Sequence, residues 1–321
     1  MGKSNLAWLS PFLALAAGLL GLAIGPGGFG LSAGPEVMAI RLPRVLLGML
    51  AGIGLASSGA ALQAVLGNPL AEPYLLGVAG GAACGSALAI VLGLGRSFLG
   101  SLASPIFAMA CALAVILFVY RLARVHGRLP AETVILSGLV ANAFCSGLIM
   151  LLMALAGRQL PEVLSLMMGS LGVLVTSGNI YLFIVCSLAI LFGSALLWIR
   201  GRELNLFSLG EAQAHSLGVA VEPFKRRTFL TVAVVVAAIV SLCGVIGFVG
   251  LIVPHLARML VGPDNRRAVP VSAMLGASLL VLADIPARTL VPQELPIGVV
   301  MALLGVPFFV FLLWRKKRSG S

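Results

Sequence analysis

Long apolar stretches separated by short polar segments form the basic pattern of this chain. A helix needs about 20 predominantly apolar residues to cross the hydrocarbon core of a membrane. The sequence predicts eight such helices, over residues 6–24, 45–66, 73–94, 97–120, 133–157, 180–199, 268–284 and 295–314. A ninth stretch, 228–262, is 35 residues long and carries almost no charge before Arg258.

The basic residues decide how often 228–262 crosses the membrane, because Lys and Arg favour the cytoplasmic side. They cluster between the apolar stretches, at Arg121/Arg124/Arg128, Arg200/Arg202, Lys225–Arg227 and Arg315–Arg318. One crossing would place the last cluster outside. Two crossings, with a break near Gly244, Gly247 or Gly250, keep it inside, and glycine is where a helix ends or bends at little cost. We therefore expect an all-α polytopic membrane protein with ten transmembrane helices and both termini in the cytoplasm.

Composition supports a membrane protein and argues against a soluble domain. Of 321 residues, 60% are hydrophobic and 10% charged, whereas soluble domains carry about 25% charged residues. The net charge of +11 does not indicate a nucleic-acid partner, since the positive residues lie in clusters between apolar stretches. All five cysteines stand singly within apolar stretches, which predicts buried small side chains rather than a metal or cofactor site.

A faint internal repeat is also visible. Ser58-Gly59 followed by Asn68-Pro69 resembles Cys243-Gly244 followed by Val253-Pro254, and both pairs keep a 185-residue offset. Inverted repeats are a common architecture of transporters. We expect one transmembrane domain over 1–321, with a weak repeat at about 41–157 and 226–314.

The motifs of common enzymes are missing from the sequence. It contains no Walker A, no HExxH, no Gly-x-Ser-x-Gly and no paired catalytic carboxylates. A membrane-embedded enzyme, such as a lipid-modifying one, normally clusters ionisable groups within its spans. An ion-coupled secondary transporter should carry a coupling carboxylate in mid-span, and its one candidate, Asp284, falls near a helix end. A transport permease without catalytic activity is the favoured class, and the other two remain alternatives.

Four polar segments interrupt the apolar pattern. They are Arg41-Leu42-Pro43-Arg44, Gly67–Pro73, Leu209–Gly218, and Ala283–Arg288 with Glu294–Gly298. The first places two arginines on the outer side, where lipid headgroups or an acidic partner would meet them. The third mixes apolar and polar residues at helical spacing between glycines, which predicts a short helix outside the membrane that docks another protein.

These four segments, in this order, resemble the FecCD family of ABC-importer permeases. The resemblance is strongest in RLPR, SGAALQAVLGNPLAEPYLLGV, SLGEAQAHSLGV, GFVGLIVPHLAR and ADIPARTLVPQELPIGVV. It implies the type II ABC importer permease fold, assembled as a homodimer with two cytoplasmic ATP-binding subunits and a periplasmic substrate-binding protein. ATP hydrolysis would lie in the separate subunit. The cargo would be an iron(III) chelate (siderophore or haem) or cobalamin, with a ferric chelate leading, carried across the cytoplasmic membrane.

The resemblance also implies roles for individual residues. Arg41, Arg44 and Arg288 match outward arginines that meet glutamates of the binding protein. Asn68, Pro69 and Leu70 match one cytoplasmic gate loop, and Ala131 and Glu132 match the facing loop, where the sequence departs from the family's small hydroxyl residues. The segment that would couple to the ATPase holds Leu209, Gly210, Glu211, Ala212, His215, Leu217 and Gly218. Met150, Met153, Met167 and Met168 would line the path or fill the membrane core.

Overall fold

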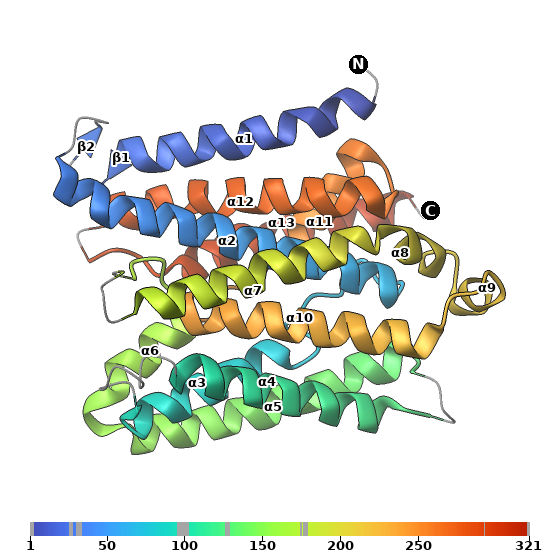
Figure 1. Cartoon of the computed structure of the whole chain (residues 1–321), viewed down its shortest axis with the longest axis horizontal. Coiled ribbons are helices and arrows are strands. Elements are labelled where there is room, and N and C mark those ends of the chain that lie inside the picture. The colour runs from blue at the N-terminus through green and yellow to red at the C-terminus, as the bar shows by residue number, and fades with distance from the viewer. Residues whose placement is uncertain are drawn as a thin grey trace.

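The structure is a computed structural model of the whole chain, drawn in Figure 1. It describes residues 3–25, 28–29, 34–94, 103–125, 129–173, 175, 179–291 and 293–319. Arg128 of the predicted basic clusters lies outside these residues, and the side chains of Arg315–Arg318 lie outside the described ones.

The described chain is almost entirely helical, as the sequence predicts. The helices are α1 Lys3–Ala23, α2 Pro35–Val65, α3 Val78–Val91, α4 Ala103–Ala123, α5 Ala131–Leu155, α6 Leu160–Met168, α7 Ile180–Ile199, α8 Gly201–Phe207, α9 Glu211–Ser216, α10 Val221–Cys243, α11 Val249–Val261, α12 Asn265–Thr289 and α13 Ile297–Ser319. A 3₁₀ turn over Gly157–Gln159 precedes α6. Two short strands, β1 Ile24–Gly25 and β2 Gly28–Phe29, pair antiparallel after α1.

Six of the described helices are long and apolar enough to cross a membrane, namely α2, α4, α5, α7, α10 and α12. Shorter apolar helices cover Leu9–Ala23, Val78–Val91, Val249–Val261 and Ile297–Val310. The chain is therefore a multi-pass membrane protein, while the count of ten crossings stays a prediction. Both termini lie toward the end of the bundle that carries α9, and the β1–β2 hairpin lies at the opposite end (Figure 1).

The long apolar stretch 228–262 breaks where the sequence predicts. Helix α10 ends at Cys243 and α11 begins at Val249. Both sides of the break adopt left-handed backbone, with φ of 71° at Gly244 and 68° at Phe248. A Cβ at Gly244 would collide with the backbone of Leu166, so glycine allows both the turn and the close approach to α6.

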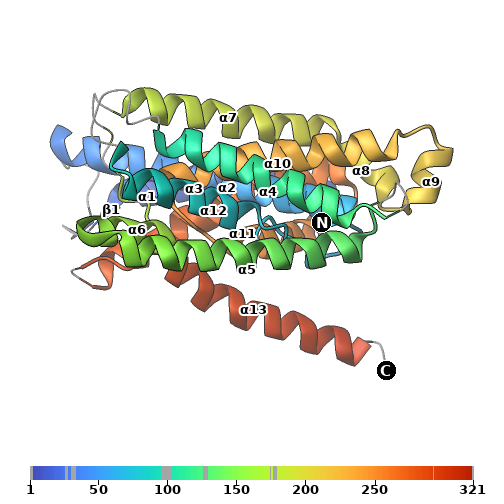
Figure 2. The ribbon, with the colours of Figure 1, turned by 90° about the horizontal axis from the view of Figure 1, so that it is seen from below.

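Helix α2 is the centre of the bundle, packed against α12, α1, α11, α10 and α7. Backbone meets backbone at two points of this packing. A side chain on Gly52 would collide with the backbone of Gly276 in α12, and one on Gly59 would collide with Gly250 in α11. Small residues permit this approach between membrane helices, which associate through close packing. At the periphery, α7 lies along one edge of the bundle and α13 diverges at the other (Figure 2).

Candidate functional site

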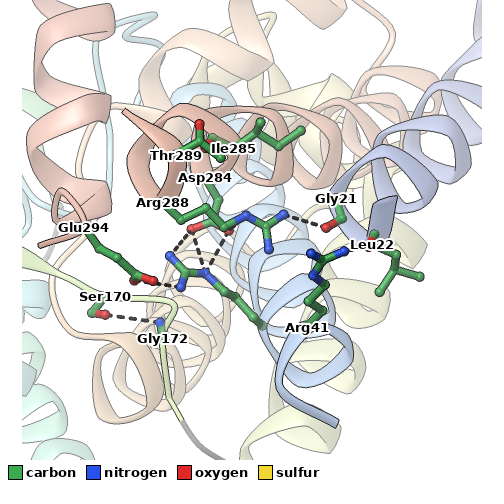
Figure 3. Close-up of polar contacts among 11 residues, drawn as sticks. Gly21, Leu22, Arg41, Ser170, Gly172, Asp284, Ile285, Arg288, Thr289 and Glu294 are labelled. Atoms are coloured by element: carbon green, nitrogen blue, oxygen red, sulfur yellow. Dashed lines mark hydrogen bonds and ion pairs between the residues drawn. The ribbon is translucent and has the colours of Figure 1, made fainter. Parts of the chain in front are cut away.

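The three arginines expected to face outward are buried within one cluster. Arg41 and Arg44 lie one turn apart in α2, and Arg288 lies near the end of α12. Their exposed fractions are 7%, 8% and 2%. Figure 3 shows this cluster, where α1, α2 and α12 meet beside the segment that holds Glu294. The guanidiniums are therefore largely covered by protein, and their role in docking a binding protein stays a prediction.

Arg44 holds the cluster together through two acids. Its Nε and Nη2 donate to both carboxylate oxygens of Asp284 at 2.9–3.1 Å, and its Nη1 donates to Glu294 Oε2 at 2.8 Å. Arg288 Nε lies 3.4 Å from Asp284 Oδ2, and its Nη2 donates to the Gly21 carbonyl at 2.5 Å. Asp284 is therefore shared by two guanidiniums.

Arg41 ties the same region to the end of α1. Its Nη1 donates to the carbonyls of Leu22 at 2.9 Å and Ala23 at 3.3 Å. A side chain on Gly25 would run into this guanidinium, so the glycine leaves room for it. Asp284 and Glu294, the two acids that organise the cluster, were not assigned this role from the sequence, although Asp284 and Arg288 have the i, i+4 spacing of a helical ion pair.

The first predicted gate segment is a tight turn that follows α2. Gly67 has a left-handed φ of 57°, and Asn68 Oδ1 accepts a hydrogen bond from the Leu70 N–H at 2.9 Å. Asn68 thus closes the turn through its own side chain. Ala131 and Glu132 open α5, immediately after Pro130. Glu132 is exposed and Ala131 is half-buried. The gate role of both segments stays a prediction.

A polar network that sequence reasoning missed connects α2 with the α8 region. Arg258 of α11, left unassigned by the charge pattern, donates to Gln63 Oε1, to the Ala60 carbonyl at 3.1 Å and to Asn265 Oδ1 at 3.4 Å. Gln63 Nε2 in turn donates to the Gly250 carbonyl at 3.1 Å. The network joins three helices around one half-buried guanidinium with neutral partners.

From Asn265 the same network continues to α8. The Asn265 N–H donates to Asn205 Oδ1 at 2.7 Å, and its side-chain amide donates to Ser208 Oγ at 3.3 Å. An unbroken series of polar contacts therefore links the segment before α9 to Gln63, five residues before Asn68.

The predicted coupling segment contains the short helix α9, which projects from the end of the bundle (Figure 1). Gly210 and Gly218 flank it with left-handed φ values of 109° and 87°. Leu209, Ala212, His215 and Leu217 are exposed, which suits a docking surface. Glu211 anchors the helix through an ion pair of 2.5 Å with Lys225 of α10. Lys225 is fully buried and also donates to the Leu129 carbonyl at 2.7 Å.

Two cavities share Tyr74, Met167 and Val245 in their walls. One of about 470 Å³ extends to Glu72, Met168 and α13, and one of about 310 Å³ extends to Asn142 and Ser146 of α5. The Glu72 carboxylate accepts a hydrogen bond from the Phe248 N–H, which ties the loop after α2 to the break before α11. Of the four methionines singled out from the sequence, Met167 and Met168 line these cavities, while Met153 packs against the core. Met150 is exposed.

Comparison with known proteins assigns the family. The family model of the FecCD transport family matches residues 12–315. The chain belongs to this family. The resemblance inferred from the four polar segments is thereby confirmed.

Individual relatives cover nearly the same range. A cobalamin import system permease protein, BtuC of Halobacterium salinarum, is 41% identical over 86% of this chain and 73% of its own length. A hemin transport system permease protein, HmuU of Yersinia pestis, is also 41% identical, over 88% of this chain and 84% of its own. Among solved structures, an inward-facing transporter described as of the metal-chelate ABC type superposes with a TM-score of 0.85 and 30% identity, covering 98% of this chain and 99% of the other.

Proposed function

We propose that this chain is the permease subunit of an ATP-driven importer that moves an iron(III) chelate or cobalamin across the cytoplasmic membrane. The observation that carries this proposal is the family match over residues 12–315. Relatives named for cobalamin and for hemin are equally identical to the chain. The proposal therefore names the class of bulky metal chelates and puts no single cargo first.

The proposed assembly is a homodimer with ten crossings per chain, two separate ATP-binding subunits on the cytoplasmic side and a binding protein outside. Two features at opposite ends of the bundle support it. Helix α9 projects at one end with exposed Leu209 and Leu217, which fit a groove on an ATPase. The arginine cluster lies near the hairpin at the other end, and Glu294 there is the half-exposed member that an incoming carboxylate would meet first.

The cavities around Tyr74 suit passage of a bulky chelate. Their walls are mostly apolar, and Glu72, Asn142 and Ser146 supply a few polar groups. Such a surface accepts a large ligand without holding it through many hydrogen bonds. We assign these residues to the translocation path of the dimer.

The alternative of an ion-coupled secondary transporter finds less support. Its candidate coupling carboxylate, Asp284, is engaged by the guanidiniums of Arg44 and Arg288. A carboxylate that binds and releases an ion in every cycle would have to leave both partners.

Co-purification tests the proposed assembly. The chain would be expressed with and without a partner ATPase and binding protein from its own genome, and uptake of labelled cobalamin, haem and ferric siderophore by the cells would be measured. We expect a stable permease–ATPase complex and uptake of one cargo class only when all components are present. Uptake by the chain alone, driven by a proton or sodium gradient, would contradict the proposal.

A further inference from the structure

A basic cavity lies where α7 ends and α12 begins. It has a volume of about 470 Å³ and is lined by Trp198, Ile199, Arg202, Asp264, Arg266 and Arg267. Helices α7 and α12 are both apolar enough to span a membrane. The cavity therefore sits where two neighbouring helices leave the apolar zone, at the level of lipid headgroups.

One wall of the cavity is apolar and open to the surroundings. Trp198 and Ile199 have exposed fractions of 53% and 73%. The Trp198 indole N–H donates to the Arg266 carbonyl at 3.3 Å, which holds the ring against the start of α12. Tryptophan favours the interface between membrane and water, where its ring meets the lipid and its N–H meets polar groups.

The exposed apolar surface continues from this wall along α7. Leu188, Phe192 and Ile184 are exposed on the same helix, which lies at the edge of the bundle (Figure 2). An acyl chain whose headgroup occupied the cavity could therefore lie along α7.

The rest of the cavity is cationic. Arg202, Arg266 and Arg267 are exposed, and no hydrogen bond or ion pair joins their guanidiniums to another described side chain. The one acid, Asp264, is already engaged, because its Oδ1 accepts from Asn205 Nδ2 at 2.7 Å and from the Arg266 N–H at 2.9 Å. Burial raises the pKa of Asp264, but these hydrogen bonds and the charges of Arg266 and Arg267 outweigh it and leave the pKa below its usual range. With Asp264 ionised, the cavity keeps a net charge of two positive units, three arginines less one aspartate.

We propose that this cavity binds the phosphodiester headgroup of an anionic phospholipid, such as phosphatidylglycerol or cardiolipin. Planar guanidiniums bind phosphate oxygens in pairs, and the exposed Trp198–Ile199 wall receives the glycerol and the start of an acyl chain. Basic pockets between membrane helices are suited to such headgroups. The apolar wall is what distinguishes a lipid from a free phosphate ion, which would gain nothing from it.

Nanodiscs and native mass spectrometry test this site. The full chain, in nanodiscs of phosphatidylcholine with increasing phosphatidylglycerol, would be compared with the variant Arg202→Gln/Arg266→Gln/Arg267→Gln. We expect the variant to bind phosphatidylglycerol about tenfold to a hundredfold more weakly at low salt, and the difference to shrink as salt is added. The matched control is Arg121→Gln/Arg226→Gln/Arg227→Gln, which removes three other exposed arginines and should retain wild-type lipid binding.

Two further arms separate the lipid from other ligands. Trp198→Ala should weaken phosphatidylglycerol binding severalfold, and millimolar inorganic phosphate should not displace the lipid. Displacement by phosphate, or equal lipid binding by the arginine variant and wild type, would overturn the proposal. So would loss of a partner ATPase from the arginine variant with lipid binding unchanged, because the surface would then be a protein contact.

Discussion

Arg44 and Asp284 stand 240 residues apart in the sequence and form a side-on ion pair inside the bundle. Both side chains are more than nine-tenths buried. If one partner were lost, water could not solvate the charge that remains. Arg288 shares the same carboxylate. The pair thus joins α2 to α12 at the end of the bundle that also holds the hairpin after α1.

Removal of the acid should therefore destabilise the whole bundle. Asp284→Asn leaves two buried guanidiniums without a full counter-charge, and breaking a buried pair costs about 3–5 kcal/mol. Thermal unfolding of the purified chain in detergent would measure this as a clear fall in the midpoint temperature. Glu36→Gln, which removes an exposed carboxylate from the first turn of α2, is the control and should lower the midpoint far less than Asp284→Asn. Equal midpoints for Asp284→Asn and wild type would show that the pair contributes nothing.

A second prediction concerns docking of the binding protein. Glu294 is half-exposed and occupies Arg44 Nη1, so an incoming carboxylate must displace it. Glu294→Gln should tighten binding of the partner severalfold at low salt. It should leave folding nearly unchanged, because the buried Arg44 keeps its pair with Asp284 and loses only a half-exposed partner.

The control for this docking experiment is Glu162→Gln, which removes an exposed negative charge from α6 without touching the arginines. The triple change of Arg41, Arg44 and Arg288 to Glu should abolish docking, but it also disrupts the buried cluster. The single change at Glu294 is therefore the sharper test. Identical affinities for Glu294→Gln and wild type would argue against Arg44 as a docking residue.

A third prediction concerns coupling through α9. Glu211→Lys places a cation against the buried Lys225, which should release α9 from α10. We expect transport-linked ATP hydrolysis of the reconstituted complex to fall at least severalfold, with membrane insertion intact. Gly210→Val should act in the same direction, since a left-handed backbone costs other residues about 1–3 kcal/mol. Glu203→Lys, on the neighbouring α8, is the control, and unchanged coupling in the Glu211 and Gly210 variants would refute the docking role of α9.

A fourth prediction concerns the number of crossings. Single cysteines at Arg124 and Lys317, in a background without the five native cysteines, should both react with a membrane-impermeant maleimide only after the cytoplasmic side is exposed. Labelling of the Lys317 position alone from outside would mean an odd number of crossings. It would show that 228–262 does not cross twice.

The pattern of apolar stretches along the sequence predicted most helices of this fold. The bounds of α7 agree with the sequence prediction of 180–199, and the glycine-rich break between α10 and α11 lies where expected. The start of α2 differed, since it begins at Pro35 instead of residue 45. Proline is favourable at the first helical position, which explains the start at Pro35. The sequence prediction began later because the polar RLPR segment lowers the hydropathy of the first turns.

The site was harder to predict because its contacts are long-range. The i, i+4 spacing relates Asp284 to Arg288, but nothing local shows that Asp284 and Glu294 would both pair with Arg44 of α2. The burial of Lys225 was also not predictable from local pattern. In the sequence it belongs to a basic cluster, whereas in the structure it is buried and paired with Glu211. Arg258 and Gln63, too, are brought together only by the packing of α11 on α2.

The most direct test of the account is ATP-dependent uptake in proteoliposomes. The purified permease–ATPase complex would be reconstituted with ATP inside the vesicles and the loaded binding protein outside, and labelled cargo in the lumen would be counted. The account predicts accumulation of cobalamin or of a ferric chelate that requires hydrolysable ATP and persists when ionophores collapse all ion gradients. Accumulation that ionophores abolish, and that a non-hydrolysable ATP analogue supports equally well, would contradict it.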